Sequence, residues 1–83
     1  MRTDLFSMVL ASIHDGMKIT FTRKNVAFAD SFLIFSSYRP KQTVTFHTKH
    51  VPYWIDFDGD EPMLLEDVPD TFLQSILKNV QPK

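Results

Sequence analysis

The chain contains no cysteine in 83 residues, and this absence constrains the fold more than any other feature of the sequence. Small domains bury a limited fraction of their surface, and many of them depend on disulfides or on a structural metal held by thiolates. Neither device is available to this chain, so apolar packing must hold the fold together. Eight Phe, two Tyr and one Trp supply large side chains for a core. We expect residues 1–83 to form a single compact domain without a cofactor.

Two segments have the apolar spacing of amphipathic helices. In residues 4–14 the apolar side chains recur every three or four positions, Thr3 is suited to cap the first turn, and Gly16 is suited to a left-handed stop. Residues 68–80 carry a second apolar stripe, with Asp67 in the position of a cap. We predict one helix at each end of the domain.

Between these helices the apolar period changes to two, which is typical of half-buried strands. Residues 17–22, 43–49 and 53–57 alternate in this way, whereas residues 26–38 are apolar on both parities, as in a central strand. Residues 62–65 lead back toward the second helix, and the apolar pattern does not assign them to a helix or a strand. The sequence predicts an α+β two-layer sandwich of order α-β-β-β(-β)-α, with an antiparallel sheet and both helices on one face.

The order helix, three strands, helix resembles that of the double-stranded-RNA-binding domain. That family grips phosphates through the lysine-rich start of its second helix. In this chain the same position reads Asp67, Val68, Pro69, Asp70, and carboxylates there would repel RNA. The resemblance therefore covers the order of elements and does not imply RNA binding.

The net charge of −1 hides two halves of opposite sign. Residues 16–50 carry six Lys or Arg against one Asp, a net of +5. Residues 51–83 carry seven Asp or Glu against two Lys, a net of −5, and residues 1–15 contribute −1. A chain with this balance is a poor general binder of polyanions. The two halves either attract each other within the molecule or present opposite poles to a partner.

The alternation along each strand also predicts which side chains face the helices and which face away from them. The helices should cover Met17, Ile19, Phe21, Val44, Phe46, Tyr53, Ile55 and Phe57. The opposite face should carry Lys18, Thr20, Thr22, Leu33, Phe35, Thr43, Thr45, His47, Lys49 and Trp54. On a face of Thr and Lys, the apolar residues Leu33, Phe35 and Trp54 would form a patch that indicates a partner. The alternative is that an irregular register turns Leu33 and Phe35 inward and packs Trp54 under the turn after Phe57.

A cluster of carboxylates follows the last predicted strand, around the turn signal Asp58-Gly59. It would present negative charge to a basic partner. The candidate protein-binding residues are therefore Asp56, Asp58, Asp60, Glu61, Glu66, Phe35 and Trp54. Self-association through an edge strand or through the aromatic sheet face is a further option, giving a homodimer.

The alternative function is nucleic-acid binding by the basic half. Its candidate residues are Arg23, Lys24, Arg39, Lys41 and Lys49. Aromatic residues are interleaved with these cations, and bases stack on exposed aromatic rings. The interleaved aromatics are Phe21, Phe28, Phe35, Tyr38, Phe46 and Tyr53, most of which are better explained as core residues.

Metal binding and catalysis find little support in the sequence. Residues 56–61 resemble the start of a calcium-binding loop, but the glycine stands at the fourth position rather than the sixth and no helix precedes it. His47 and His50 would point to opposite faces of a strand and could not share a zinc ion. With only Gly16 and Gly59 in the chain, there is no glycine-rich phosphate loop. We predict no metal site, no catalytic residues and no enzyme activity.

The N-terminus places Arg2 before the apolar residues 5–13, which is the order of a secretory signal. However, Asp4 interrupts the basic flank, and the residues from His14 onward do not form a small-residue cleavage site. No run approaches the ~20 apolar residues of a membrane span. The chain begins at Met1 and ends shortly after the last predicted helix, as complete small products of viruses and mobile elements do. We expect a soluble, cytoplasmic, non-enzymatic protein of regulatory, inhibitory or adaptor type that acts by binding another protein.

Overall fold

The computed structural model describes residues 2–22, 41–59 and 61–80, and the side chains from Asp4 onward within them. In chain order the elements are α1 (Arg2–Ser12), β1 (Lys18–Thr22), β2 (Lys41–His47), β3 (Trp54–Phe57), β4 (Met63–Leu64), the 3-10 helix η2 (Leu65–Asp67) and α2 (Asp70–Val80). This order confirms the predicted helix, antiparallel strands and helix.

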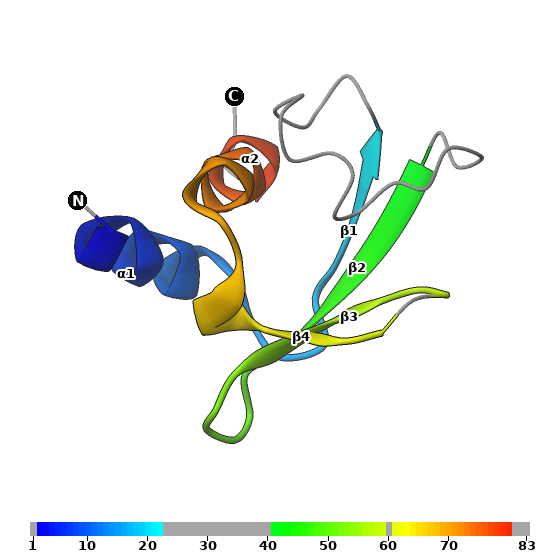
Figure 1. The fold of residues 1–83 in the computed structure, drawn as a ribbon, viewed down its shortest axis with the longest axis horizontal. Helices are drawn as coiled ribbons and strands as arrows, with labels where there is room; N and C mark the ends of the chain where they lie inside the picture. Colours follow the sequence, from blue (N-terminus) through cyan, green and yellow to red (C-terminus); the bar gives the residue numbers. More distant parts are fainter. Residues whose placement is uncertain (1, 23–40, 60, 81–83) are drawn as a thin grey trace.

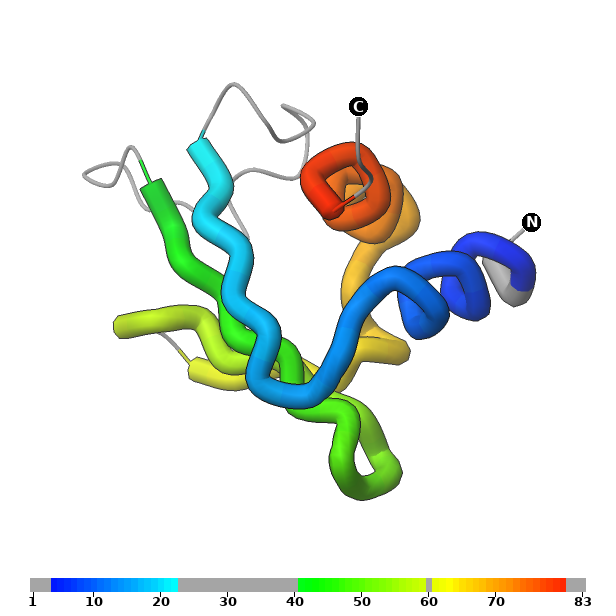
Figure 2. Tube along the Cα trace, turned by 180° about the vertical axis from the view of Figure 1, so that it is seen from behind, coloured from blue at the N-terminus to red at the C-terminus, as the bar shows by residue number. Residues whose placement is uncertain are grey.

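The four strands form one antiparallel sheet in the order β1-β2-β3-β4, so each strand pairs with its neighbour in sequence. In the register of the sheet, Ile19 lies opposite Val44 and Phe46 lies opposite Ile55. Both helices lie on the same side of the sheet and contact each other (Figure 1). The view from behind shows the same two layers, with the sheet on one side and the helices on the other (Figure 2). The predicted α+β architecture is confirmed.

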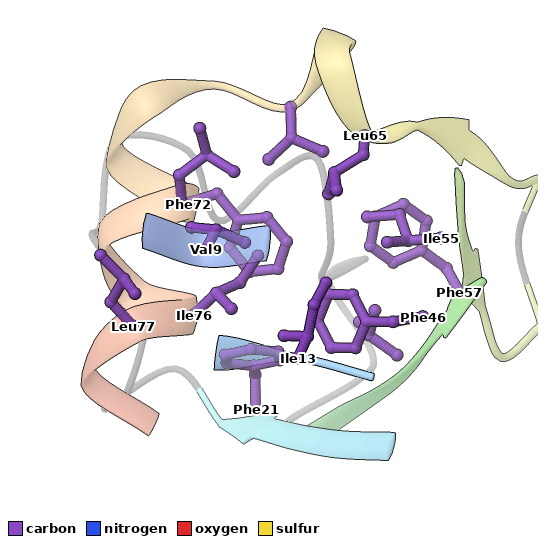
Figure 3. Packing of buried hydrophobic residues seen from close by; sticks show 13 residues of the cluster. Val9, Ile13, Phe21, Phe46, Ile55, Phe57, Leu65, Phe72, Ile76 and Leu77 are labelled. Carbon is purple, nitrogen blue, oxygen red and sulfur yellow. The ribbon is translucent and has the colours of Figure 1, made fainter. Parts of the chain in front are cut away.

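The core fills the space between the helices and one face of the sheet (Figure 3). The ring of Phe72 from α2 lies between strand residues, with its centroid 5.0 Å from that of Phe21 and 6.4 Å from that of Phe57. Burial of a large apolar side chain contributes ~1.5 to 3 kcal/mol. All eight residues predicted to face the helices are buried or packed against this core, namely Met17, Ile19, Phe21, Val44, Phe46, Tyr53, Ile55 and Phe57.

The second helix begins later than the sequence predicts. The amides of Phe72 and Leu73 donate to the carbonyl of Pro69 at 3.1 and 3.0 Å, and the helix proper starts at Asp70. Val68 is extended, with φ −73° and ψ 131°. The residue before a proline is sterically pushed out of helical geometry, so Pro69 separates the helix from the residues before it. The prediction of Asp67 as the cap is wrong, because Asp67 lies in η2.

The first helix lies two residues earlier than predicted. It spans Arg2–Ser12 rather than residues 4–14, which places Thr3 within the helix instead of before it. The predicted left-handed conformation of Gly16 is confirmed, with φ +84°, but Gly16 lies in the turn after the helix and does not end it, because α1 already ends at Ser12. The amide of Gly16 donates to the carbonyl of Phe46 at 2.7 Å, so the turn between α1 and β1 is hydrogen-bonded to β2.

The strand boundaries also differ from the prediction. β2 begins at Lys41 and ends at His47, because the next two amides leave the ladder and donate to the Asp15 carboxylate. The unassigned residues 62–65 supply β4 and the start of η2. β1 and β2 are direct neighbours, and the strand predicted over residues 26–38 lies outside the described residues.

Candidate functional site

The outer face of the sheet, defined as the face that points away from the helices, divides into a polar half and an aromatic half. Its described residues are Lys18, Thr20, Thr22, Lys41, Thr43, Thr45, His47, Trp54, Asp56 and Leu64. Lys49 was predicted on this face but lies in the loop after β2, beyond the end of the strand. Leu33 and Phe35 lie outside the described residues.

The polar half lies over β1 and β2. The Thr20 and Thr43 hydroxyl oxygens, on directly opposed residues, are 2.9 Å apart and share a hydrogen bond. One row further along, Lys18 Nζ donates to Thr45 Oγ1 at 3.2 Å. Cross-strand pairs of this kind are typical of a solvated sheet surface. Nothing about this half requires a partner.

The aromatic half centres on Trp54. The imidazole ring of His47 stacks on the indole, with the ring centroids 3.9 Å apart and the planes 9° from parallel. On the other side, Trp54 is paired with Leu64 of β4. His47, Trp54 and Leu64 therefore form one row across three strands. His47 Nε2 is buried and has no hydrogen-bond partner among the described residues, so packing against the indole is what holds the imidazole.

A hollow of about 360 Å³ opens beside the indole at the edge of the sheet, lined by Trp54, Pro62, Met63 and Leu64. These four side chains are apolar or largely apolar. The volume lies at the lower end of the range for binding cavities, roughly 300 to 1,000 Å³, and leaves room for a bulky apolar side chain. The hollow lies at the two-residue strand β4, which the sequence pattern did not assign.

Three of the predicted carboxylates lie on β3 and on the connection to β4, next in sequence to residues that line this hollow. Asp56 is half-buried and stands two residues from Trp54 on the same face of β3. Asp58 and Glu61 are exposed on the connection between β3 and β4, and Glu61 directly precedes the lining residue Pro62.

Two other predicted candidates cannot be placed with them, because Asp60 and Phe35 lie outside the described residues. Glu66 lies apart from the hollow. It belongs to η2 and lines a different, smaller pocket of about 160 Å³, together with Phe6, Val51, Pro52 and Tyr53. The structure therefore joins Trp54 to part of the acidic segment and separates Glu66 from it.

The described part of the basic set does not form a cluster. Lys41 starts β2 and Lys49 follows its end, and a strand rise of about 3.4 Å per residue puts ~20 Å between them. Arg23, Lys24 and Arg39 lie outside the described residues.

The aromatics interleaved with these cations are mostly not exposed where the structure describes them. Phe21 and Phe46 are completely buried in the core, and Tyr53 is half-buried against it. Phe21 and Phe46 therefore present no open face to a nucleic-acid base. Phe28, Phe35 and Tyr38 lie outside the described residues.

The described part of the chain consists of three stretches, residues 2–22, 41–59 and 61–80. Within them, no group of three or more His, Cys, Asp or Glu side chains is placed to hold a metal ion. His50 lies in the exposed loop after β2, whereas His47 stacks on Trp54. Neither described helix has the length and apolar content needed to cross a bilayer.

Sequence reasoning missed His47 as the partner of Trp54, and it missed Pro62, Met63 and Leu64 as the walls of the hollow. The stack follows from the β2–β3 register, which pairs His47 with Trp54. A register cannot be read from alternation within one strand. No protein-family model, no curated protein and no solved structure matches this chain.

Proposed function

We propose that this chain is a small non-enzymatic protein-binding module of regulatory, inhibitory or adaptor type, and that the hollow beside Trp54 is its contact site. The observation that carries the proposal is the position of Trp54, which stands beside an apolar hollow on a sheet face rather than in the core. Tryptophan is among the residues that most often dominate the energy of protein interfaces. Its large apolar ring and its N–H group suit a surface that is wet when free and covered when bound.

The rigidity of the site supports the same function. Trp54 is held on β3 between strands β2 and β4, and its ring is stacked on His47. A side chain fixed in this way loses little freedom when a partner covers it, which reduces the cost of binding. In the polar half of the outer face, Thr20 is hydrogen-bonded to Thr43 and Lys18 to Thr45 across the strands. Such a surface is typical of a sheet face in contact with solvent. The contact site is therefore confined to the aromatic half.

Nucleic-acid binding is the weaker alternative. A base could stack on Trp54, but the carboxylate of Asp56 stands two residues away on the same face and would repel the phosphates. The described aromatics of the basic half are in or against the core. The observations around Trp54 therefore favour a protein over a polynucleotide.

The test is a selection of short random peptides displayed on phage, using the whole 83-residue chain as bait. We expect enriched peptides that bind wild type and are lost on Trp54→Ala. Val51→Ala is the matched control, because Val51 is an apolar side chain that is 81% exposed and lines the other pocket. Binding should survive this control.

The proposal fails if no peptide is enriched, or if the enriched peptides bind Trp54→Ala as well as wild type. The alternative is tested by titrating labelled single-stranded oligonucleotides at two salt concentrations. Tight binding that weakens steeply with salt would replace the proposal with the nucleic-acid function.

A further inference from the structure

We infer that the hollow beside Trp54 takes one apolar side chain from a basic segment of a partner protein, with Lys or Arg residues flanking that side chain. This inference rests on the proposed function and adds the chemistry of the partner. It combines the shape of the hollow with the charges at its rim.

The walls define the central group of the ligand. A hollow of about 360 Å³ lined by Trp54, Pro62, Met63 and Leu64 excludes a charged group, because burying an unpaired charge against apolar walls is costly. The space admits a bulky aliphatic or aromatic side chain, which would bury its surface against the indole. The anchor is therefore apolar.

The rim defines the flanking groups. Asp56 lies on β3 and Glu61 on the connection between β3 and β4, and neither has a hydrogen bond or ion pair with another described residue. The exposed Asp58 adds negative charge between them. Among the described residues of the outer face, the cation nearest to Asp56 in the strand register is Lys18, whose Nζ donates to Thr45 Oγ1. The rim is therefore negative, and Lys or Arg beside the anchor would complement it.

The same charges select between classes of partner. Nucleic acids and anionic membrane surfaces both carry phosphates, and these would meet carboxylates at the rim. An acidic protein segment would be repelled in the same way. A basic segment gains attraction during encounter and specificity in the bound state.

The experiment uses three synthetic peptides of equal length. The first has a central Leu flanked by Lys, the second has the same Leu flanked by Glu, and the third has Lys flanks with Ser in place of Leu. Trp54 is the only tryptophan of the chain, so its fluorescence reports binding at the hollow directly. We expect the first peptide to bind the most tightly and its affinity to fall as salt screens the rim.

Charge variants locate the effect. Exposed charge pairs are modest, so Asp56→Asn combined with Glu61→Gln should weaken the Lys-flanked Leu peptide about three- to tenfold. Asp67→Asn is the matched control, because it removes an exposed carboxylate in η2 from a residue that does not line the hollow, and its affinity should equal that of wild type. The unfolding midpoint of each variant shows that it is folded.

The outcomes separate the two proposals. Equal or tighter binding of the Glu-flanked peptide, or no loss of affinity in the charge variant, would overturn the basic partner and leave protein binding in place. Tight binding of the peptide that lacks Leu would overturn the apolar anchor. If none of the three peptides binds and phage selection also yields none, both the inference and the proposed function fail.

Discussion

The two faces of the sheet use aromatic side chains in opposite ways. On the inner face, Phe21 and Phe46 are fully buried in a cluster that also contains Val9 of α1 and Phe72 of α2. On the outer face, Trp54 points away from the two described helices and stacks on His47 beside an open hollow. Both faces belong to the same strands, so a shift of one residue along the chain separates a core ring from a surface ring.

The difference between the two faces implies that one set of residues stabilises the fold and another set serves binding. In a chain without cysteine, the inner face has to supply the apolar burial that opposes the entropy of folding. A second set of apolar residues on the outer face adds little to that core and exposes apolar surface to water. Substitutions on the inner face should therefore lower stability, and substitutions on the outer face should mainly affect binding.

The largest loss of stability should follow removal of a central inner ring. Phe72 is 1% exposed and its ring packs against Phe21 and Phe57. Phe72→Ala should reduce the free energy of unfolding by ~3 to 5 kcal/mol, through lost burial and the cavity left behind. Urea denaturation followed by circular dichroism measures this change. Trp54→Ala is the outer-face counterpart, and a loss as large as that of Phe72→Ala would break the comparison.

A smaller loss should follow removal of the one polar side chain in the inner layer of β2. Gln42 is 2% exposed, and its Nε2 donates to the Asp58 carbonyl at 2.8 Å. Gln42→Met keeps most of the side-chain volume but removes the donor, which should cost ~1 to 3 kcal/mol. Thermal and urea unfolding measure the loss. Stability equal to that of wild type would mean that packing alone determines the inner face.

A similar or smaller loss of stability should follow substitution of Asp15, which links the turn after α1 to the sheet. One oxygen of Asp15, Oδ1, accepts from the amides of Thr48 and Lys49 at 2.9 and 3.1 Å and ties the turn after α1 to the loop after β2. Asp15→Ala removes both hydrogen bonds, and because the site is exposed we expect a cost of ~1 to 2 kcal/mol. Asp15→Asn keeps an acceptor oxygen and should lose less. An equal loss in both variants would assign the effect to charge rather than to hydrogen bonding.

The smallest effect should come from the polar half of the outer face. Thr20→Val removes the hydrogen bond to Thr43 but keeps a β-branched side chain in an exposed strand position. We expect a change in the unfolding free energy within about 0.5 kcal/mol, measured by urea denaturation. A loss above that of Asp15→Ala would show that this half of the face stabilises the fold.

The fold was predictable because burial imposes a period that each strand carries on its own. The alternation through Val44 and Phe46, and through Ile55 and Phe57, identifies the inner face without knowledge of any partner strand. The start of α2 was predicted two residues early, because the effect of Pro69 on its predecessor outweighed the apolar stripe.

The site was predictable only in part. The carboxylates Asp56 and Glu61 and the ring of Trp54 were identified, but nothing in the sequence grouped them with Leu64. Their grouping depends on the pairing of β3 with a strand of two residues, which is too short to show a period. The burial of Gln42 was overlooked for a related reason. A polar residue is expected at the surface, and the Asp58 carbonyl that accepts its hydrogen bond lies 16 residues further along the chain.

The most direct test of the proposed contact site is a chemical-shift map. The 15N-labelled chain is titrated with the Lys-flanked Leu peptide, and amide shifts are followed by NMR. The largest changes should fall on His47, Trp54 and Leu64 and on the indole N–H, with little change in α1 and α2. Largest changes in the helices, or around Lys41 and Lys49, would contradict the assignment of the outer aromatic half as the contact site.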